Sequence, residues 1–161
     1  MNLNKKHSGL MLLAVALMAL ISMQGCELND LSPDEQMLID GTHPILGSWR
    51  LYAFVSADGS SKVPRPTIED CKTCYTIVIK QDKTIEGEAV ANLLSGYFDF
   101  KNNTIKLGLA TYALAISPED AVRFELEIIP KINKFKIEDD QLFLFYPENN
   151  YLLFHRTIEE P

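Results

Sequence analysis

The sequence predicts a mainly β domain, a small antiparallel barrel or sandwich of about eight strands with one helix near the C-terminal third. Two observations lead to this prediction. Short segments of alternating apolar and polar residues recur between residues 46 and 156, and turns rich in Asn, Asp and Pro separate them. Helix start and stop signals accompany one segment, residues 118–129. Such a succession of short strands is typical of small barrels and sandwiches.

Residues 1–25 predict a secretory signal peptide. Lys5 and Lys6 precede an uncharged apolar run that ends at Gly25. A membrane-spanning helix needs about 20 apolar residues, and this run is shorter. Gly25 followed by Cys26 resembles the lipobox of bacterial lipoproteins, in which the cysteine sulfur receives a diacylglycerol and the cysteine becomes the new N-terminus. The alternative is an ordinary signal peptide cut near Gly25, which leaves Cys26 as a free thiol.

Lipidation of Cys26 predicts a protein anchored in the bacterial cell envelope, in the outer rather than the inner membrane, facing the periplasm or the cell surface. Palmitate-like chains contribute about 0.8 kcal/mol per buried methylene, so two or three of them hold a protein on a membrane. Residues 26–44 are polar and contain Pro33 and Pro44, which predicts a lipidated N-terminus and a flexible tether. One or two helical turns fit residues 34–39. The folded domain is expected at residues 45–157.

The charge balance excludes one class of partner. The formal net charge is −7, and residues 1–25 hold two lysines and no acidic residue, so the remainder carries −9. A nucleic-acid-binding protein needs a basic surface, and none is predicted here. Electrostatic binding to anionic lipid is disfavoured for the same reason.

The domain is expected to begin with a strand at residues 46–55, followed by a long loop at residues 56–70. Alternation places four residues of this strand on one buried face: Trp49, Leu51, Ala53 and Val55.

Two hairpins are predicted next, with a break at residues 92–95 between them. The first comprises residues 75–80 and 84–89, and the second comprises residues 97–100 and 104–110, with its turn at residues 101–103. The side chains expected to face the core are Tyr75, Ile77, Ile79, Ile85, Ile105, Leu107 and Leu109.

Residues 118–129 carry two conflicting signals. Strict alternation of apolar and charged residues suits a strand, whereas Ser117 and Pro118 followed by two acidic residues form a strong helix start. We therefore predict a helix that ends before Pro130. Its buried face is expected to carry Val122, Leu126 and Ile129.

Three further strands complete the predicted domain, at residues 132–137, 141–146 and 151–156. The segment from Leu142 to Phe145 is apolar at every position, which predicts a strand covered on both faces.

A series of residues also points to a known family: Gly47-Ser48-Trp49-Arg50-Leu51, then Gly87, Asn92 and Gly96 with the aromatic after it, Phe124, Leu142, Leu144 and Leu152-Leu153-Phe154. Their order and spacing resemble the META domain family of HslJ-like bacterial lipoproteins over roughly residues 46–156. The resemblance implies a META-like barrel in an envelope lipoprotein linked to stress tolerance, without established catalytic chemistry. Family members commonly carry two internal cysteines where this chain has Ala91 and Ala115, so a redox role tied to that pair is not implied.

Cys71 and Cys74 are the strongest candidates for chemistry. In an oxidising compartment a Cys-x-x-Cys closes a small disulfide, which here would brace the long loop. A thioredoxin-like pair lies at a helix start, whereas this pair precedes a strand, and Glu69 and Asp70 beside it disfavour a thiolate. We predict a structural disulfide. Free thiols and a redox or metal role are the alternatives.

No cofactor, metal or catalytic site is predicted. A closed zinc site needs four ligands, and besides the cysteines the mature chain offers only His43 and His155. Glu86 and Glu88 share one face of a strand, but alternation puts them on the solvent side. The sequence has no nucleophile elbow and no phosphate-binding glycine loop.

We therefore predict a non-enzymatic envelope lipoprotein that is held on the membrane by its lipid and binds an envelope protein, another envelope component or a small ligand. Two alternatives remain open. One is a thiol-disulfide oxidoreductase that uses Cys71 and Cys74, and the other is a purely structural lipoprotein. Tyr52 and Tyr97 would mark a binding surface if both were exposed together.

Overall fold

The structure, a computed structural model, describes residues 31–101, 104–113 and 118–157. Residues 34–161 form one compact unit. Its first element is the helix α2 (Pro33–Ile39), at the position where one or two helical turns were expected. Leu38 of α2 is buried in the core, so this part of the predicted tether belongs to the folded unit.

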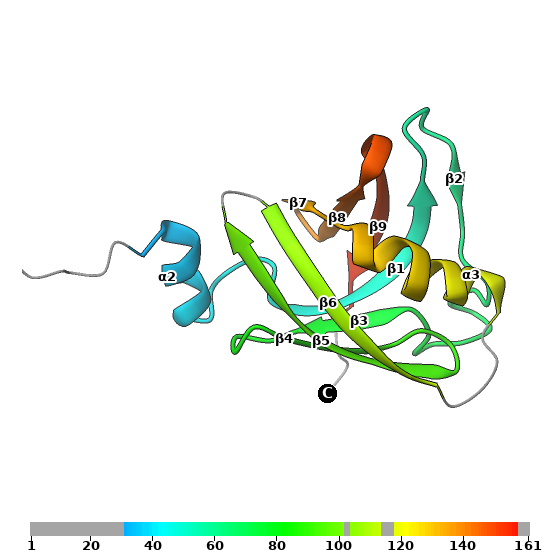
Figure 1. The fold of residues 1–161 in the computed structure, drawn as a ribbon, viewed down its shortest axis with the longest axis horizontal. Helices are drawn as coiled ribbons and strands as arrows, with labels where there is room; N and C mark the ends of the chain where they lie inside the picture. The colour runs from blue at the N-terminus through cyan, green and yellow to red at the C-terminus, as the bar shows by residue number, and fades with distance from the viewer. Residues whose placement is uncertain (1–30, 102–103, 114–117, 158–161) are drawn as a thin grey trace, which may run out of the picture. The chain divides into compact units, whose positions relative to one another are not determined.

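Within the described residues, nine antiparallel strands form one curled sheet (Figure 1). Eight of them follow the order β1-β3-β4-β5-β6-β7-β8-β9, and β9 pairs back onto β1, so the sheet is barrel-like. The two-residue β2 pairs with the end of β1. The predicted fold class is therefore confirmed. The strands are β1 (Gly47–Val55), β2 (Ser61–Lys62), β3 (Thr76–Ile79), β4 (Thr84–Glu88), β5 (Asn92–Lys101), β6 (Thr104–Ala113), β7 (Lys134–Glu138), β8 (Gln141–Tyr146) and β9 (Asn150–Arg156).

A continuous helical segment connects β6 to β7 and supplies part of the core. It consists of α3 (Glu119–Val122), the π-helical η1 (Arg123–Ile128) and the 3₁₀ turn η2 (Ile129–Lys131). Because β6 and β7 pair only at Thr104 and Lys134, the strands diverge, and the helical segment lies between them (Figure 1). The predicted helix is confirmed. It starts one residue later than expected, with Pro118 as the N-cap.

The predicted buried face of this helix is wrong in two of its three residues. Val122 is partly exposed and Leu126 is 61% exposed, while Ile129 is buried as expected. The face that contacts the core carries Phe124 and Ile128, together with the buried carboxylate Glu125. Glu125 accepts a hydrogen bond from Asn92 Nδ2 at 3.1 Å. Apolar periodicity alone places a glutamate outside the core, because the partner that permits its burial is distant in the chain.

Strand β1 contains a β-bulge, and the four residues of its predicted buried face are all buried. Opposite β9, the register shifts between Leu51 and Ala53, so Tyr52 is the extra residue. After the bulge Phe54, rather than Ala53 or Val55, joins the hydrophobic core. From Leu51 to Val55 every residue except Tyr52 is buried. Apolar residues stand on both sides of the bulge, so the sequence pattern does not indicate the shift in register.

The hairpins occur where they were predicted, with one correction. The expected break at residues 92–95 is wrong, because these residues are the start of β5 and pair with β6. The chain turns instead at residues 89–91, where the Ala89 amide donates to the Asn92 carbonyl. Asn102 and Asn103 of the expected turn, and the side chains of Leu107 and Leu109, lie outside what the structure describes. Five predicted inward side chains are buried: Tyr75, Ile77, Ile79, Ile85 and Ile105.

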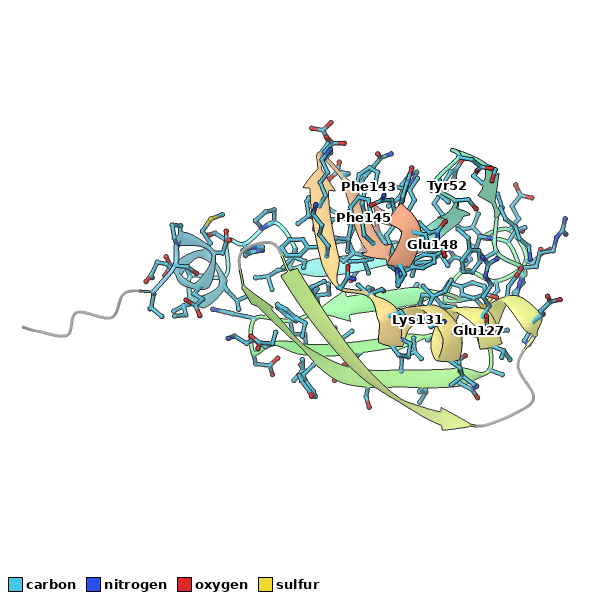
Figure 2. All side chains as sticks on the ribbon, turned by 45° about the horizontal axis from the view of Figure 1, so that its top comes forward. Tyr52, Glu127, Lys131, Phe143, Phe145 and Glu148 are labelled. Carbon is cyan, nitrogen blue, oxygen red and sulfur yellow. A yellow bond between two sulfur atoms is a disulfide. The ribbon has the colours of Figure 1, made fainter. Side chains whose placement is uncertain are left out.

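Strand β8 is not fully covered on both faces as predicted. Leu142 and Leu144 are buried, whereas Phe143 and Phe145, which are labelled in Figure 2, are only half-buried. These two rings pack against Tyr151 of β9, with ring centroids 5.5 and 5.4 Å apart respectively. Aromatic neighbours on the outer surface, rather than a second layer, shield this face.

Candidate functional site

A cleft of about 180 Å³ opens beside β1, the end of β9 and the long loop that follows β2. Its walls are largely apolar, and three of the lining side chains are substantially exposed: Tyr52, Val63 and Ile68. Exposed apolar side chains gathered around one concavity are the usual sign of a binding site. The other lining residues are Arg50, Leu51, Pro64, Pro66, Thr67, Tyr75, His155, Arg156 and Thr157.

The loop wall of the cleft is attached to the barrel by polar contacts. The Tyr75 hydroxyl donates to the Arg65 carbonyl at 2.5 Å. Asp120 of the helix, itself buried, accepts from the Arg65 amide at 3.0 Å and pairs with Lys62. Burial, with Asp120 and Glu125 nearby, raises the pKa of Tyr75 well above its ordinary value, so this hydroxyl remains a donor.

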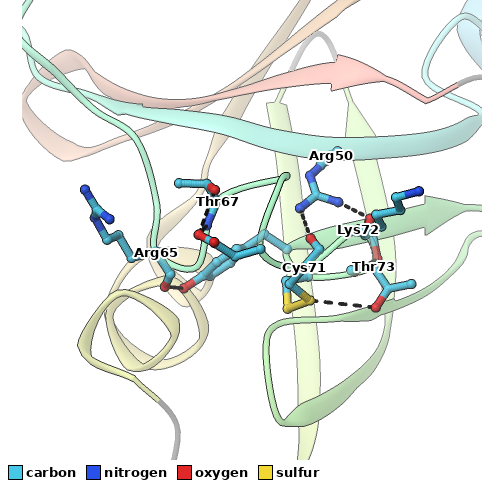
Figure 3. The surroundings of a disulfide bond; sticks show 10 residues. Arg50, Arg65, Thr67, Cys71, Lys72 and Thr73 are labelled. Carbon is cyan, nitrogen blue, oxygen red and sulfur yellow. Dashed lines mark hydrogen bonds between the residues drawn. A yellow bond between two sulfur atoms is a disulfide. The ribbon is translucent and has the colours of Figure 1, made fainter.

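Arg50 is the buried cation of the cleft. It is 7% exposed, and its guanidinium donates to the backbone carbonyls of Cys71 and Lys72 (Figure 3). No carboxylate of the described residues lies within ion-pair distance of this guanidinium. Burial lowers the pKa of Arg50, but a guanidinium remains charged at neutral pH. The cleft therefore contains a positive charge neutralised only by carbonyl dipoles.

An aromatic pair forms the wall from β1 and β9. The rings of Tyr52 and His155 stack with their centroids 4.4 Å apart and an angle of 11° between their planes. His155 also contacts Gln141, and the Nε2 atoms of the two side chains are 3.2 Å apart. Tyr52 is the extra residue of the β1 bulge, and its ring is 53% exposed on this wall.

Arg156 also lines the cleft, but its guanidinium already has partners. It lies over the Trp49 ring at 4.1 Å, and Nε is 3.3 Å from Asp140. It also donates to the carbonyls of Leu46 and Pro44, at 2.9 and 2.7 Å. Its charge contributes to the positive potential of the cleft, while its hydrogen bonds hold the segment that precedes β1.

Cys71 and Cys74 lie next to the cleft, in the segment that supplies the acceptors of Arg50. Their sulfur atoms are 2.07 Å apart and the Cα atoms are 5.5 Å apart, so the geometry agrees with the predicted disulfide (Figure 3). Cys74 is buried. The pair precedes β3, as expected, and is not at the start of a helix.

The two histidines that were considered as metal ligands lie in different surroundings. His155 belongs to the cleft, whereas His43 is buried between α2 and β1, with Nε2 3.9 Å from Asp34. Among the described residues no three His, Cys, Asp or Glu side chains gather in a metal-binding arrangement. Glu86 is exposed and pairs with Lys80.

Tyr52 and Tyr97 are both exposed, by 53% and 64%, but they do not form one surface. Tyr52 is on β1 and Tyr97 is on β5, with β3 and β4 between the two strands. Cys26 lies outside the described residues.

Sequence reasoning did not single out most of the cleft residues as a site, including Arg50, Val63 and Ile68. Val63 and Ile68 are apolar residues in a polar loop, which is a weak signal of a binding surface. Arg50 sits between two apolar residues that face the core. Arg50 is buried because the loop folds over it. Its guanidinium donates to the carbonyls of Cys71 and Lys72, which are more than twenty positions away in the sequence.

Two solved structures are similar to this chain in fold. An NMR structure of a protein from Burkholderia xenovorans matches with a TM-score of 0.60 and 20% identity, over 80% of this chain and 94% of the other. A crystal structure of a DUF4847 family protein from Bacteroides vulgatus matches with a TM-score of 0.56 and 17% identity, over 71% of this chain and 94% of the other. These likenesses show the fold alone.

No protein-family model and no curated protein matches the sequence. None of the helices in the described part of the chain is long and apolar enough to span a membrane.

Proposed function

We propose that this protein is a non-enzymatic, lipid-anchored envelope protein whose β domain binds a small ligand in the cleft between β1, β9 and the long loop. The observation that carries the proposal is the cleft itself. Val63 is 52% exposed and Ile68 is 60% exposed on its wall, and such exposure is costly unless a ligand covers it. The anchor is proposed from the Gly25-Cys26 sequence.

The oxidoreductase alternative has less support. The nucleophile of a redox Cys-x-x-Cys is its first thiol, here Cys71, and its thiolate is stabilised at a helix N-terminus, whereas this pair precedes the strand β3. The pair instead lies where it would brace the loop that holds Arg50. The META family resemblance remains a proposal about ancestry, and the cleft proposal does not depend on it.

Native mass spectrometry of the lipoprotein, gently solubilised from its own host membrane, tests the binding proposal. We expect a reproducible adduct beyond the mass of the acylated chain. The variant Val63→Trp places a large ring in the cleft and should abolish the adduct. Val122→Trp makes the same change at an exposed position of the helix and should retain it. A bare acylated chain from every preparation would overturn the proposal in favour of a structural role.

A further inference from the structure

We propose that the ligand of this cleft is a small aromatic carboxylate whose carboxylate pairs with Arg50 and whose ring packs against Tyr52 and the loop. This inference rests on the proposed ligand-binding function and adds the chemical class of the ligand. Three properties of the cleft carry it: its volume, its apolar walls and its buried cation.

The volume sets the size of the apolar group. An engineered apolar cavity of about 150 Å³ binds one benzene molecule. The cleft holds about 180 Å³, which is room for one ring and a small substituent. A long acyl chain or a sugar dimer does not fit this space.

The walls favour a flat ring over a polar group. The exposed Tyr52 ring lies flat against His155 and offers a planar surface. Pro64 and Pro66 contribute rigid apolar rings from the loop, and Val63 and Ile68 add branched side chains. Aromatic groups gain from stacking on such surfaces beyond the area that they bury.

Arg50 sets the charge of the ligand. A buried guanidinium without an anionic partner is electrostatically unfavourable, and two carbonyl acceptors use only part of its five N–H donors. A carboxylate matches the planar fork of a guanidinium, and pairing in this shielded place is stronger than in water. Two acidic side chains in contact with the loop have other partners, since Asp70 accepts from Thr67 and Asp120 pairs with Lys62.

Three probes with the same ring and different charges test the inference: benzoate, benzyl alcohol and benzylamine. The protein is the purified full chain, and the signals are the methyl NMR resonances of Val63 and Ile68, with the core residue Ile85 as a reference. We expect benzoate to shift the cleft methyls with an affinity at least about tenfold higher than benzyl alcohol, because hydrogen bonds to charged groups are stronger than neutral ones. Benzylamine should bind most weakly.

A substitution then assigns the preference to Arg50. Arg50→Gln should remove the advantage of benzoate over benzyl alcohol while the alcohol still shifts Val63 and Ile68. Arg50→Lys keeps the charge and should restore part of the advantage. Lys136→Gln removes a cation on β7, away from the cleft, and should change neither affinity.

The outcomes separate the two proposals. Equal or tighter binding of the alcohol, relative to benzoate in the wild-type chain, overturns the carboxylate inference and leaves the ligand-binding function standing. If none of the three probes shifts the cleft methyls, the aromatic carboxylate inference is overturned, and the adduct in native mass spectrometry decides the ligand-binding function separately. Because these measurements use the wild-type chain, a failure of Arg50→Gln to fold does not prevent the test.

Discussion

Single residues of this protein are constrained by backbone contacts that their side-chain chemistry does not reveal. Gly87 on β4 is an example, since it pairs with Ile77 and lies against the backbone of β3. A Cβ at this position would overlap the Thr76 carbonyl oxygen. Only glycine therefore allows the two strands to approach this closely.

Gly87→Ala should lower the free energy of unfolding by about 1–3 kcal/mol, because the strand must move to admit the methyl group. Urea unfolding measures the change. Asp99→Ala changes an exposed residue of β5 and should stay within about 0.5 kcal/mol. Equal stabilities for the two variants would show that β4 accommodates the Cβ without strain.

His43 should make stability depend on pH. Burial lowers the pKa of His43, and the nearby Asp34 only partly opposes this. Its Nδ1 accepts a hydrogen bond from the Ile45 amide at 3.1 Å, which requires the unprotonated form. The unfolded state binds the proton more readily, so this contribution is complete above pH about 6.5 and is lost as the pH falls towards the lower folded value.

Urea unfolding between pH 8 and about 5 checks this prediction, because the free energy of unfolding should decrease over that range. His43→Gln should remove most of the decrease. An unchanged pH dependence in the variant would show that another group is responsible.

Hydrogen bonds lower the pKa values of Asp58, Asp70 and Asp82. The contributions of these carboxylates to stability are therefore lost only at lower pH, below their ordinary pKa of about 4.

At the scale of elements, the helical segment shows how a buried polar pair decides which face points inward. Phe124 is fully buried and contacts the Tyr75 ring edge-on, with centroids 5.7 Å apart. Leu126, which the apolar pattern placed in the core, faces outward. Asn92 donates to one carboxylate oxygen of Glu125, while the other, Oε1, is buried without a hydrogen-bond partner among the described residues.

Phe124→Ala should therefore lower the free energy of unfolding by about 3–5 kcal/mol, whereas Leu126→Ala should change it by less than about 0.5 kcal/mol. Thermal or urea unfolding of the two variants gives the comparison. Similar losses in both would contradict the orientation of the helix.

The segment that carries Cys71 and Cys74 should act as a brace for the loop. Replacing both with serine removes a small covalent ring and should lower the free energy of unfolding by about 2 kcal/mol in the chain-entropy estimate. Hydrogen exchange at the amides of residues 67–73 should become faster, because this segment supplies the acceptors of Arg50. If alkylation without reductant labels both cysteines in protein taken from its native envelope, the disulfide prediction is wrong.

At the scale of the whole molecule, the folded unit carries the cleft and Cys26 carries the proposed anchor. Cys26→Ser should move the protein from the membrane fraction to the soluble fraction and abolish incorporation of labelled palmitate, because the acyl chains supply the membrane affinity. The double serine variant of Cys71 and Cys74 should remain in the membrane fraction. Membrane retention of Cys26→Ser would mean that another feature anchors the chain.

Most of the fold was predictable because local patterns specify it. Strand β8 occupies the predicted residues 141–146, and β3, β4 and the helix lie within two residues of their expected limits. The predicted strand limits and faces were wrong where neighbouring residues were uniformly apolar or were polar. The bulge at Tyr52 and the start of β5 at Asn92 interrupt no clear apolar period, so nothing local marked them.

The sequence by itself determined the class of the fold and the order of its elements, since periodicity, turn residues and composition are local properties. Tertiary structure alone decided the buried face of the helix, the bulge in β1 and the cleft around Arg50. Each of these depends on a contact between distant residues, such as Glu125 with Asn92 or Arg50 with the carbonyls of Cys71 and Lys72. The free energy of burying a charge depends on the partner that folding brings to it, and a linear sequence does not contain that distance.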